Sequence, residues 1–154
     1  MHKLQLHRGY NILKAVIDTY IKTNNIKFNS SENASSDFQI IKEDYIKTGM
    51  LTVYNGGDHG HLGKEYNIKF RAVHDFMHIK YNLSFKFNDE RILSDKTILD
   101  FRSIASQLGY RLEERRILGK IINAEIRGQI DYFAEHRSYV EDQKEFINNI
   151  LKVG

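Results

Sequence analysis

Apolar residues recur every three or four positions along several long segments of this chain. The first such segment, 6–23, carries them at Tyr10, Leu13, Ile17, Tyr20 and Ile21. This spacing places them on one side of an α-helix, and that side must be buried against another element. Further helices are expected at 67–81, 94–108, 111–136 and 140–153. The periodicity therefore predicts a mainly α-helical fold of about five helices.

One short segment departs from the helical pattern. Residues 50–54 are rich in β-forming side chains and are followed by Asn55-Gly56-Gly57, which predicts a strand that ends in a turn. Small polar residues at 29–37 predict a loop, 38–45 fits a helix or a strand, and 85–87 fits a brief extended piece. The expected fold class is mainly α (α+β), with a small β element near residues 50–54.

Composition limits the organisation and the location of the protein. The chain has 154 residues, 41% of them hydrophobic, and neither an internal repeat nor a long linker divides it, so a single domain over 1–154 is expected. No apolar run approaches the ~20 residues that span a bilayer, and the first residues lack the apolar stretch of a secretory signal. We therefore expect a cytoplasmic protein without a membrane partner.

Composition also excludes several chemistries. The absence of cysteine excludes disulfides, Cys-ligated zinc, iron–sulfur clusters and a thiol nucleophile. Neither a G-x-S-x-G motif nor a dinucleotide-binding or P-loop motif is present. The net charge of +3 is spread along the chain, so it permits nucleic-acid binding without indicating it.

Two histidines stand out in the segment Phe70-Arg-Ala-Val-His-Asp-Phe-Met-His78. His74 and His78 are four residues apart, so on a helix their rings lie one turn apart on one side. One helix offers two nitrogens to a metal in this way in H-E-x-x-H zinc sites, and here the pattern is H-D-x-x-H, with Asp75 in second place. Such pairs also arise by chance, and the alternative is a structural role.

A second anomaly is a carboxylate on an apolar helix face. That face of the predicted helix 111–136 carries Leu118, Ile121, Ile122, Tyr132 and Phe133. At ~100° per residue, Glu125 and Gln129 fall near its centre. A buried carboxylate needs a partner, which is either an arginine, Arg71 or Arg127, or a metal ion.

Together these observations predict a metal site with three protein ligands. His74, His78 and Glu125 would bind the metal and leave a position for water, as in catalytic zinc sites. Asp75 would act as general base, and Gln129 would orient a ligand or a water molecule. Zinc is the first expectation, and iron(II), manganese and nickel also suit imidazole and carboxylate ligands.

Other residues have weaker claims to this site. Glu90 follows Asn88-Asp89 in a polar turn and is interpreted as a solvated residue at the start of a helix. His59 and His61 are interpreted as parts of a solvated loop, although this turn can close over the helix with His74. His136 is expected near the C-terminus of a helix, where a cation is favourable.

These motifs resemble those of a group of small uncharacterised phage proteins. The shared pattern is F-R-A-x-H-D with a second histidine, then Asp89-Glu90, then an E-x-x-G-Q segment at Glu125 to Gln129, then Glu141-Asp-Gln143. The resemblance covers roughly the last 90 residues and implies a phage or prophage origin. If so, the protein works in the host cytoplasm.

A more distant resemblance is to the gluzincin metallopeptidases. In that family H-E-x-x-H supplies two zinc ligands, and a later helix supplies a glutamate that is followed four residues on by an acidic residue. The resemblance implies ligand roles for His74, His78 and Glu125, with Asp75 as base and Gln129 beside the ligands. Asp75 replaces the family's catalytic glutamate, Gln129 replaces its acidic residue, and the chain is short for that fold.

Two functions follow from these patterns. The first is a phage-encoded metal-binding protein that acts as a metal-dependent hydrolase on an unknown substrate. The second is a non-enzymatic phage accessory protein that binds a host protein or nucleic acid. In that case His74, Asp75, Glu125 and Gln129 form a buried structural network, and Arg111, Arg115, Arg116 and Lys120 can meet phosphates.

Overall fold

A computed structural model describes residues 1–154. The chain is 70% helical, which confirms the mainly α (α+β) prediction. In chain order the elements are α1 (Lys3–Thr23), β1 (Phe28–Ser31), α2 (Phe38–Thr48), β2 (Leu51–Tyr54), the 3₁₀ turn η1 (Gly60–Leu62), α3 (Gly63–Tyr81), α4 (Phe87–Gln107), α5 (Leu112–Asn123), the π-helical turn η2 (Ala124–Gly128), α6 (Gln129–His136) and α7 (Gln143–Ile150).

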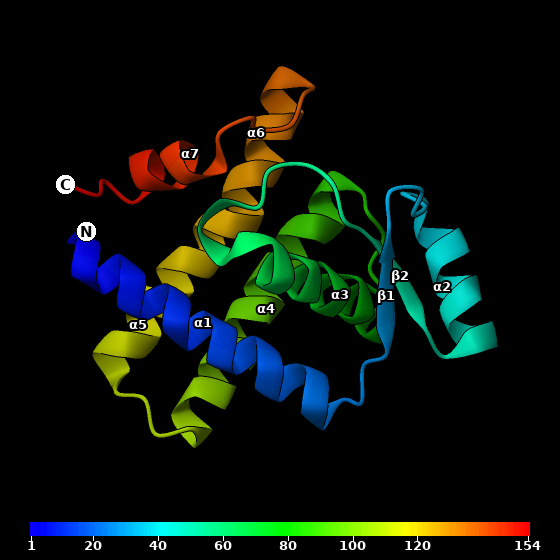
Figure 1. The fold of residues 1–154 in the computed structure, drawn as a ribbon, viewed down its shortest axis with the longest axis horizontal. Helices are drawn as coiled ribbons and strands as arrows, with labels where there is room; N and C mark the ends of the chain where they lie inside the picture. The colour runs from blue at the N-terminus through cyan, green and yellow to red at the C-terminus, as the bar shows by residue number, and fades with distance from the viewer.

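Helix α3 lies in the middle of the fold (Figure 1). It contacts α1, α4 and strand β2, while α4 and α1 also pack against α5. The two strands and α2 lie together at one end of the molecule, and α6 with α7 forms the opposite upper edge (Figure 1). Both chain ends meet there, because the N-terminal ammonium of Met1 donates to the carbonyl oxygens of Leu151 (3.1 Å) and Lys152 (2.9 Å).

The sheet consists of two parallel strands joined by α2. Phe28 pairs with Leu51 and Ser31 with Tyr54. Strand β2 confirms the strand predicted near residues 50–54, and its residues alternate between buried and exposed. The loop expected over 29–37 is wrong at its beginning, because the polar residues 29–31 belong to β1. Their pairing is backbone hydrogen bonding to β2, which a polar sequence can form without an apolar face.

The structure decides one segment that the sequence left open and moves several helix starts, of which that of α4 moves furthest. The ambiguous segment 38–45 is helical and belongs to α2, where the Asp37 carboxylate caps the first turn and Gly49 (φ 72°) ends the helix. Helix α4 begins at Phe87 rather than at Ser94, so the expected extended piece at 85–87 is wrong. The first turn of α4 lacks an apolar stripe but is favoured by two acidic residues at its N-terminus.

The predicted long helix 111–136 is continuous but not uniform. It consists of α5, η2 and α6, and the π-helical turn η2 stands between the two regular parts. Ala124, Glu125 and Ile126 of this turn are buried. Helix α7 packs against η2, and Gly128 permits the approach, since a Cβ there would lie 2.7 Å from Ile150 Cδ1.

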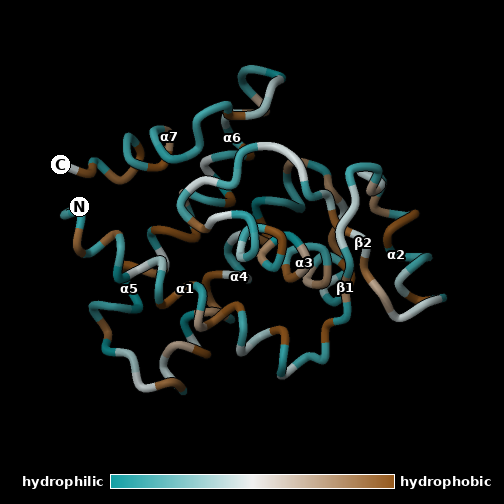
Figure 2. The backbone as a smooth tube through the Cα atoms, viewed as in Figure 1, coloured by the Kyte–Doolittle hydropathy of each residue, from teal (hydrophilic) through white to brown (hydrophobic).

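The core is one connected cluster of 25 buried hydrophobic residues, drawn from six helices, the 3₁₀ and π-helical turns, strand β2 and Ile26 before β1. Its largest fully buried members include Leu13 of α1, Met77 of α3, Phe101 of α4 and Ile122 of α5. Hydrophobic and hydrophilic residues alternate along these helices, as the amphipathic pattern predicted (Figure 2). No helix is both long enough and apolar enough to cross a bilayer.

The contact between α1 and α5 gives a test of this packing. Gly9→Ala is expected to destabilise the protein by about 1–3 kcal/mol, because the new Cβ would lie 2.3 Å from Ile121 Cδ1 and 2.8 Å from Ile117 Cγ2. Gly119→Ala is the control, since its Cβ would meet neighbours at 3.5 Å or more, and the better helix propensity should stabilise by about 0.5–1 kcal/mol. Urea denaturation measures both, and equal effects of the two variants would contradict the packing.

Candidate metal centre

One face of α3 carries the polar side chains of the candidate site. At ~100° per residue, Arg71, His74, Asp75 and His78 all fall within one third of the helix circumference. The predicted histidine pair is present on this face, with the ring centroids 4.6 Å apart and the two Nε2 atoms 3.1 Å apart. The pair therefore presents two nitrogens to one point in space.

His78 is held rigidly, and its orientation is fixed. Its side chain is fully buried, and its ring packs edge-on against Phe85, 4.6 Å away between centroids. Its Nδ1 lies 2.7 Å from the carbonyl oxygen of Leu83, in the turn that follows Asn82 (φ 52°) at the end of α3. A carbonyl oxygen only accepts, so Nδ1 carries the proton and donates. When the ring is neutral, Nε2 is then the unprotonated nitrogen. In metal sites the same kind of hydrogen bond fixes the histidine tautomer and leaves the other nitrogen free to bind the metal.

Glu90 completes the group. Its Oε1 contacts His78 Nε2 and lies 3.3 Å from His74 Nε2. These three ligand atoms all lie within 4.8 Å of one another, and no other set of three or more such residues does so. The short turn between α3 and α4 brings Glu90 here, and it is fixed by Asp89, whose Oδ2 accepts from the backbone nitrogen (2.9 Å) and the hydroxyl (2.7 Å) of Ser84.

The acidic member of the group is therefore Glu90 and not Glu125, which corrects the ligand set expected from the sequence. Glu90 was interpreted as a solvated residue at the start of a helix. It does lie in the first turn of α4, but this turn folds back toward the end of α3, so the carboxylate contacts the histidines instead of solvent alone. The signal that could have found it is a carboxylate at the start of the helix that directly follows the helix with the histidine pair.

The electrostatics show how strongly the three groups interact. Burial opposes ionisation of Glu90, but the hydrogen bonds and charges of His74 and His78 outweigh it and lower the pKa of Glu90 to about 2. Burial acts to lower the pKa of His74, but its hydrogen bond and charge interaction with Glu90 raise it above the ordinary value. Burial lowers the pKa of His78. An ionised carboxylate therefore lies beside two imidazole nitrogens. A cation shared by the three groups, either a proton or a metal ion, would stabilise this arrangement.

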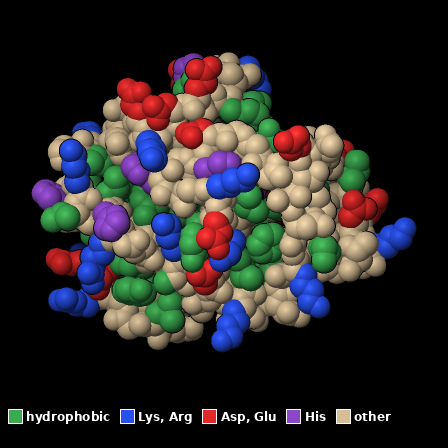
Figure 3. Space-filling view, viewed as in Figure 1, with side chains coloured by type: hydrophobic (Ala, Val, Ile, Leu, Met, Phe, Trp, Pro, Cys, Tyr) green, Lys and Arg blue, Asp and Glu red, His purple; other side chains and the backbone are tan.

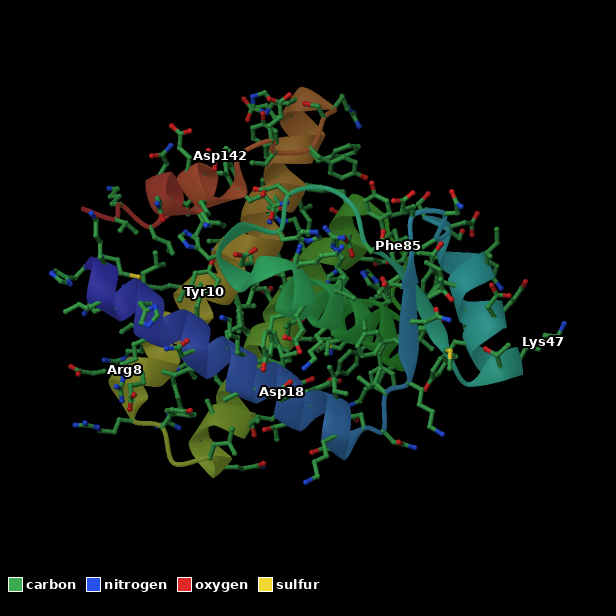
Figure 4. All side chains as sticks on the ribbon, viewed as in Figure 1. Arg8, Tyr10, Asp18, Lys47, Phe85 and Asp142 are labelled. Carbon is green, nitrogen blue, oxygen red and sulfur yellow. The ribbon has the colours of Figure 1, made fainter.

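The group is closed on one side and open on the other. The side chains of His74 and Glu90 are 21% and 19% exposed, while that of His78 has no exposure. Aromatic rings close the inner side, since Phe38 of α2 lies 6.1 Å from the His78 ring and Phe85 lies closer. Phe85 is labelled in Figure 4 at the end of the molecule that carries the sheet. A cation at this position would keep contact with solvent on the outer side.

Asp75 lies on the same face and is not a member of the ligand group. It is half-buried, and it makes neither a hydrogen bond nor a salt bridge. Burial raises its pKa to about 6, and the charge of Glu90 adds to this while His74 and Arg71 oppose it. A free carboxylate with a raised pKa beside the ligands has the properties of a general base.

Glu125 belongs to a second polar group. Its Oε1 accepts from the hydroxyl of Tyr10 at 2.5 Å, and its Oε2 accepts from Gln129 Nε2 at 3.3 Å. Gln129 lies within 3.5 Å of Gln143 Oε1 at the start of α7. Burial raises the pKa of Glu125 to about 7. In Figure 4, Tyr10 on α1 lies beside the segment of α5 and η2.

The sequence was right that Glu125 is buried and needs a partner, but it missed the partner. Neither expected arginine pairs with Glu125, since Arg127 lies 3.6 Å from Asp95 and Arg71 donates to backbone carbonyls. The structural network expected from His74, Asp75, Glu125 and Gln129 is likewise divided, because only the last two are bonded to each other.

The remaining histidines have local partners. His59 Nδ1 lies 3.1 Å from Asn67 Nδ2, and His61 Nε2 lies 2.9 Å from Asn148 Oδ1. The 3₁₀ turn η1, which carries His61, adjoins the start of α3 and also contacts α7 and α1. His136 is the last residue of α6, as expected.

Comparisons of this chain with protein-family models, with curated proteins and with solved structures found no match.

Proposed function

We propose that this protein binds one divalent metal ion through His74, His78 and Glu90 and uses it to catalyse hydrolysis. The observation that carries the proposal is the convergence of His74 Nε2, His78 Nε2 and Glu90 Oε1 within 4.8 Å. His78 supports it further, because its Nδ1 proton is committed to a backbone carbonyl and its Nε2 lone pair faces the group. The motif resemblance adds a phage origin to this proposal.

Zinc is the proposed metal among the divalent ions that suit this donor set. Two imidazole nitrogens and one carboxylate leave a fourth position for water, which is the composition of catalytic zinc sites of the two-histidine, one-glutamate type. The partial exposure of His74 and Glu90 is consistent with such a position on the outer side.

A bound divalent cation lowers the pKa of a coordinated water to about 7 and polarises the oxygen of a scissile carbonyl or phosphoryl group. Asp75 would accept the proton that this water loses, and its free, half-buried carboxylate supports that role. The ion would supply this activated water as the nucleophile, and the bond from its oxygen to the carbonyl carbon or to phosphorus would replace the bond to the leaving group. Asp75 would hold the proton taken from the water and return it to the leaving group, so that protons balance. Gln129 has no part in this scheme, because its amide is bonded to Glu125.

Asp75→Asn separates binding from catalysis. We expect this variant to keep one equivalent of metal and to lose hydrolysis by about 10²–10⁴-fold, because the amide cannot accept the proton. Metal content and the hydrolysis of p-nitrophenyl acetate and p-nitrophenyl phosphate by the zinc-loaded protein measure the two properties. Hydrolysis at the wild-type rate by the variant would remove Asp75 from the mechanism.

The same preparation tests the proposal as a whole. The wild-type protein, stripped by chelator and titrated with zinc, manganese, nickel or iron(II), is expected to take up one equivalent of at least one of these ions. No uptake of any of them, together with salt-dependent binding to nucleic acid, would favour the non-enzymatic phage accessory protein instead.

A further inference from the structure

Arg71 occupies the same face of α3 as the proposed metal ligands, one turn before His74. Its Nη1 donates to the carbonyl oxygens of Tyr54 (2.6 Å) and Gly56 (2.9 Å), which fixes the plane of the guanidinium at the end of β2. The same group lies 5.5 Å from the centre of the Tyr54 ring. Arg71 is therefore oriented by the backbone of the segment that follows β2.

This guanidinium keeps donors that nothing in the chain uses. Arg71 is half-buried and forms no salt bridge, and both of its hydrogen bonds come from Nη1, which leaves Nη2 and Nε. Gly57 lies beside Nη2, and a Cβ at this position would be only 3.7 Å away. The glycine, in a backbone conformation with φ 77°, presents no side chain to this side of the guanidinium.

The surroundings carry charges of both signs. Besides burial, the positive charges of Arg71 and Lys64 lower the pKa of His59, while the charge of Asp58 opposes them. Basic, histidine and acidic side chains are interspersed on the face of the molecule that Figure 3 shows. The carboxylate of Asp75 interacts with the charge of Arg71, but the two side chains form no salt bridge. A fixed, half-buried cation without a bound carboxylate favours an anion from outside the chain.

We infer that the substrate of this centre carries an oxyanion, as a phosphate ester or a carboxylate does, and that Arg71 binds it beside the metal. The inference rests on the proposed function, since His74, His78 and Glu90 hold the ion next to which the oxyanion lies. Arg71 is a positioning residue: its free donors match the two oxygens of such a group, and the scissile bond is then held near Asp75.

The test is calorimetric titration of the zinc-loaded and the metal-free protein with inorganic phosphate and, separately, with acetate. Arg71→Gln is expected to weaken binding of the preferred anion roughly tenfold or more, while the zinc affinity stays within about twofold. Arg71→Lys, which keeps the charge and loses the fork, is expected to weaken binding by a smaller factor. Arg127→Gln, which removes a guanidinium that lies 3.6 Å from Asp95, is the matched control and should bind the anion like the wild type.

The outcomes separate the inference from the proposed function. Zinc binding without anion binding, or anion binding that the Arg71 variants leave unchanged, overturns the inference and leaves the metal centre standing. If zinc does not bind but the metal-free protein loses phosphate binding on Arg71→Gln, the metal centre fails and the oxyanion site stands. If Arg71→Gln does not fold, Arg71→Lys provides the test. An anion affinity equal to that of the wild type in Arg71→Lys would show that the paired donors of the guanidinium are not required, and it would overturn the inference. The preference for phosphate over acetate, or the reverse, identifies the kind of oxyanion.

Discussion

Glu90→Gln is expected to lower the affinity for zinc on the order of 100-fold or more. An amide lacks the charge of the carboxylate whose Oε1 lies 3.3 Å from His74 Nε2 and contacts His78. Loss of a group that merely orients a ligand already costs about 10–100-fold in metal affinity, so loss of an anionic ligand should cost at least as much. Competition with a chromophoric chelator measures the affinity.

Glu125→Gln is the matched control, because it is the same chemical change at the other buried glutamate. It should leave zinc affinity within about twofold of the wild type, since Glu125 bonds to Tyr10 and Gln129 and is not a member of the ligand group. Circular dichroism spectra and the cooperativity of unfolding establish that both variants fold. Zinc loss in Glu125→Gln with retention in Glu90→Gln would restore the ligand set that the sequence predicted.

The histidine pair could be predicted from the sequence because its geometry is local. Residues four apart on a helix face the same way whatever the rest of the fold does, and the helix boundaries of α3 place both histidines inside it. Glu90 could not be predicted in the same way. Its place depends on where α4 begins and on how α4 folds back on α3, and neither is encoded in a periodic pattern.

The error at the beginning of α4 explains the error in the site. The polar sequence at 87–90 has no apolar stripe, and the pattern becomes periodic only near Ser94. Tertiary contacts and the acidic first turn extend the helix toward its N-terminus. The polar strand β1 was missed for a related reason. Its stabilisation comes from backbone pairing with β2, which the side-chain pattern of β1 does not reveal.

Glu125 shows what an amphipathic pattern can and cannot say. The pattern correctly identified a carboxylate on a buried face, and a cation was expected to offset the free-energy cost of burying its charge. In the structure the partner is Tyr10 of α1, whose hydroxyl donates to Glu125 at 2.5 Å. The sequence pattern counted this tyrosine among the apolar residues of its helix, so its hydroxyl was not considered as a partner.

Glu125 also makes the stability of the protein depend on pH. Burial raises its pKa in the folded state from 4.5 to about 7. Between these values the folded state binds more protons than the unfolded state, so the free energy of unfolding falls as the pH rises through this window. Above pH 7 the whole cost of the buried charge is present, about 3 kcal/mol for a shift of this size.

Glu125→Gln removes this cost and keeps an oxygen that accepts from Tyr10. Relative to the wild type, the variant should therefore gain about 3 kcal/mol in free energy of unfolding between pH 4 and pH 8. Urea denaturation at several pH values measures the difference, in which the contributions of all other groups cancel. Glu135→Gln, at an exposed carboxylate of α6, is the control and should show almost no such gain. The contrary result is a difference in free energy of unfolding between Glu125→Gln and the wild type that stays constant from pH 4 to pH 8. Glu125 would then have the same pKa in the folded and the unfolded state. In that case the buried hydrogen bond to Tyr10 would not be the environment of this carboxylate in solution.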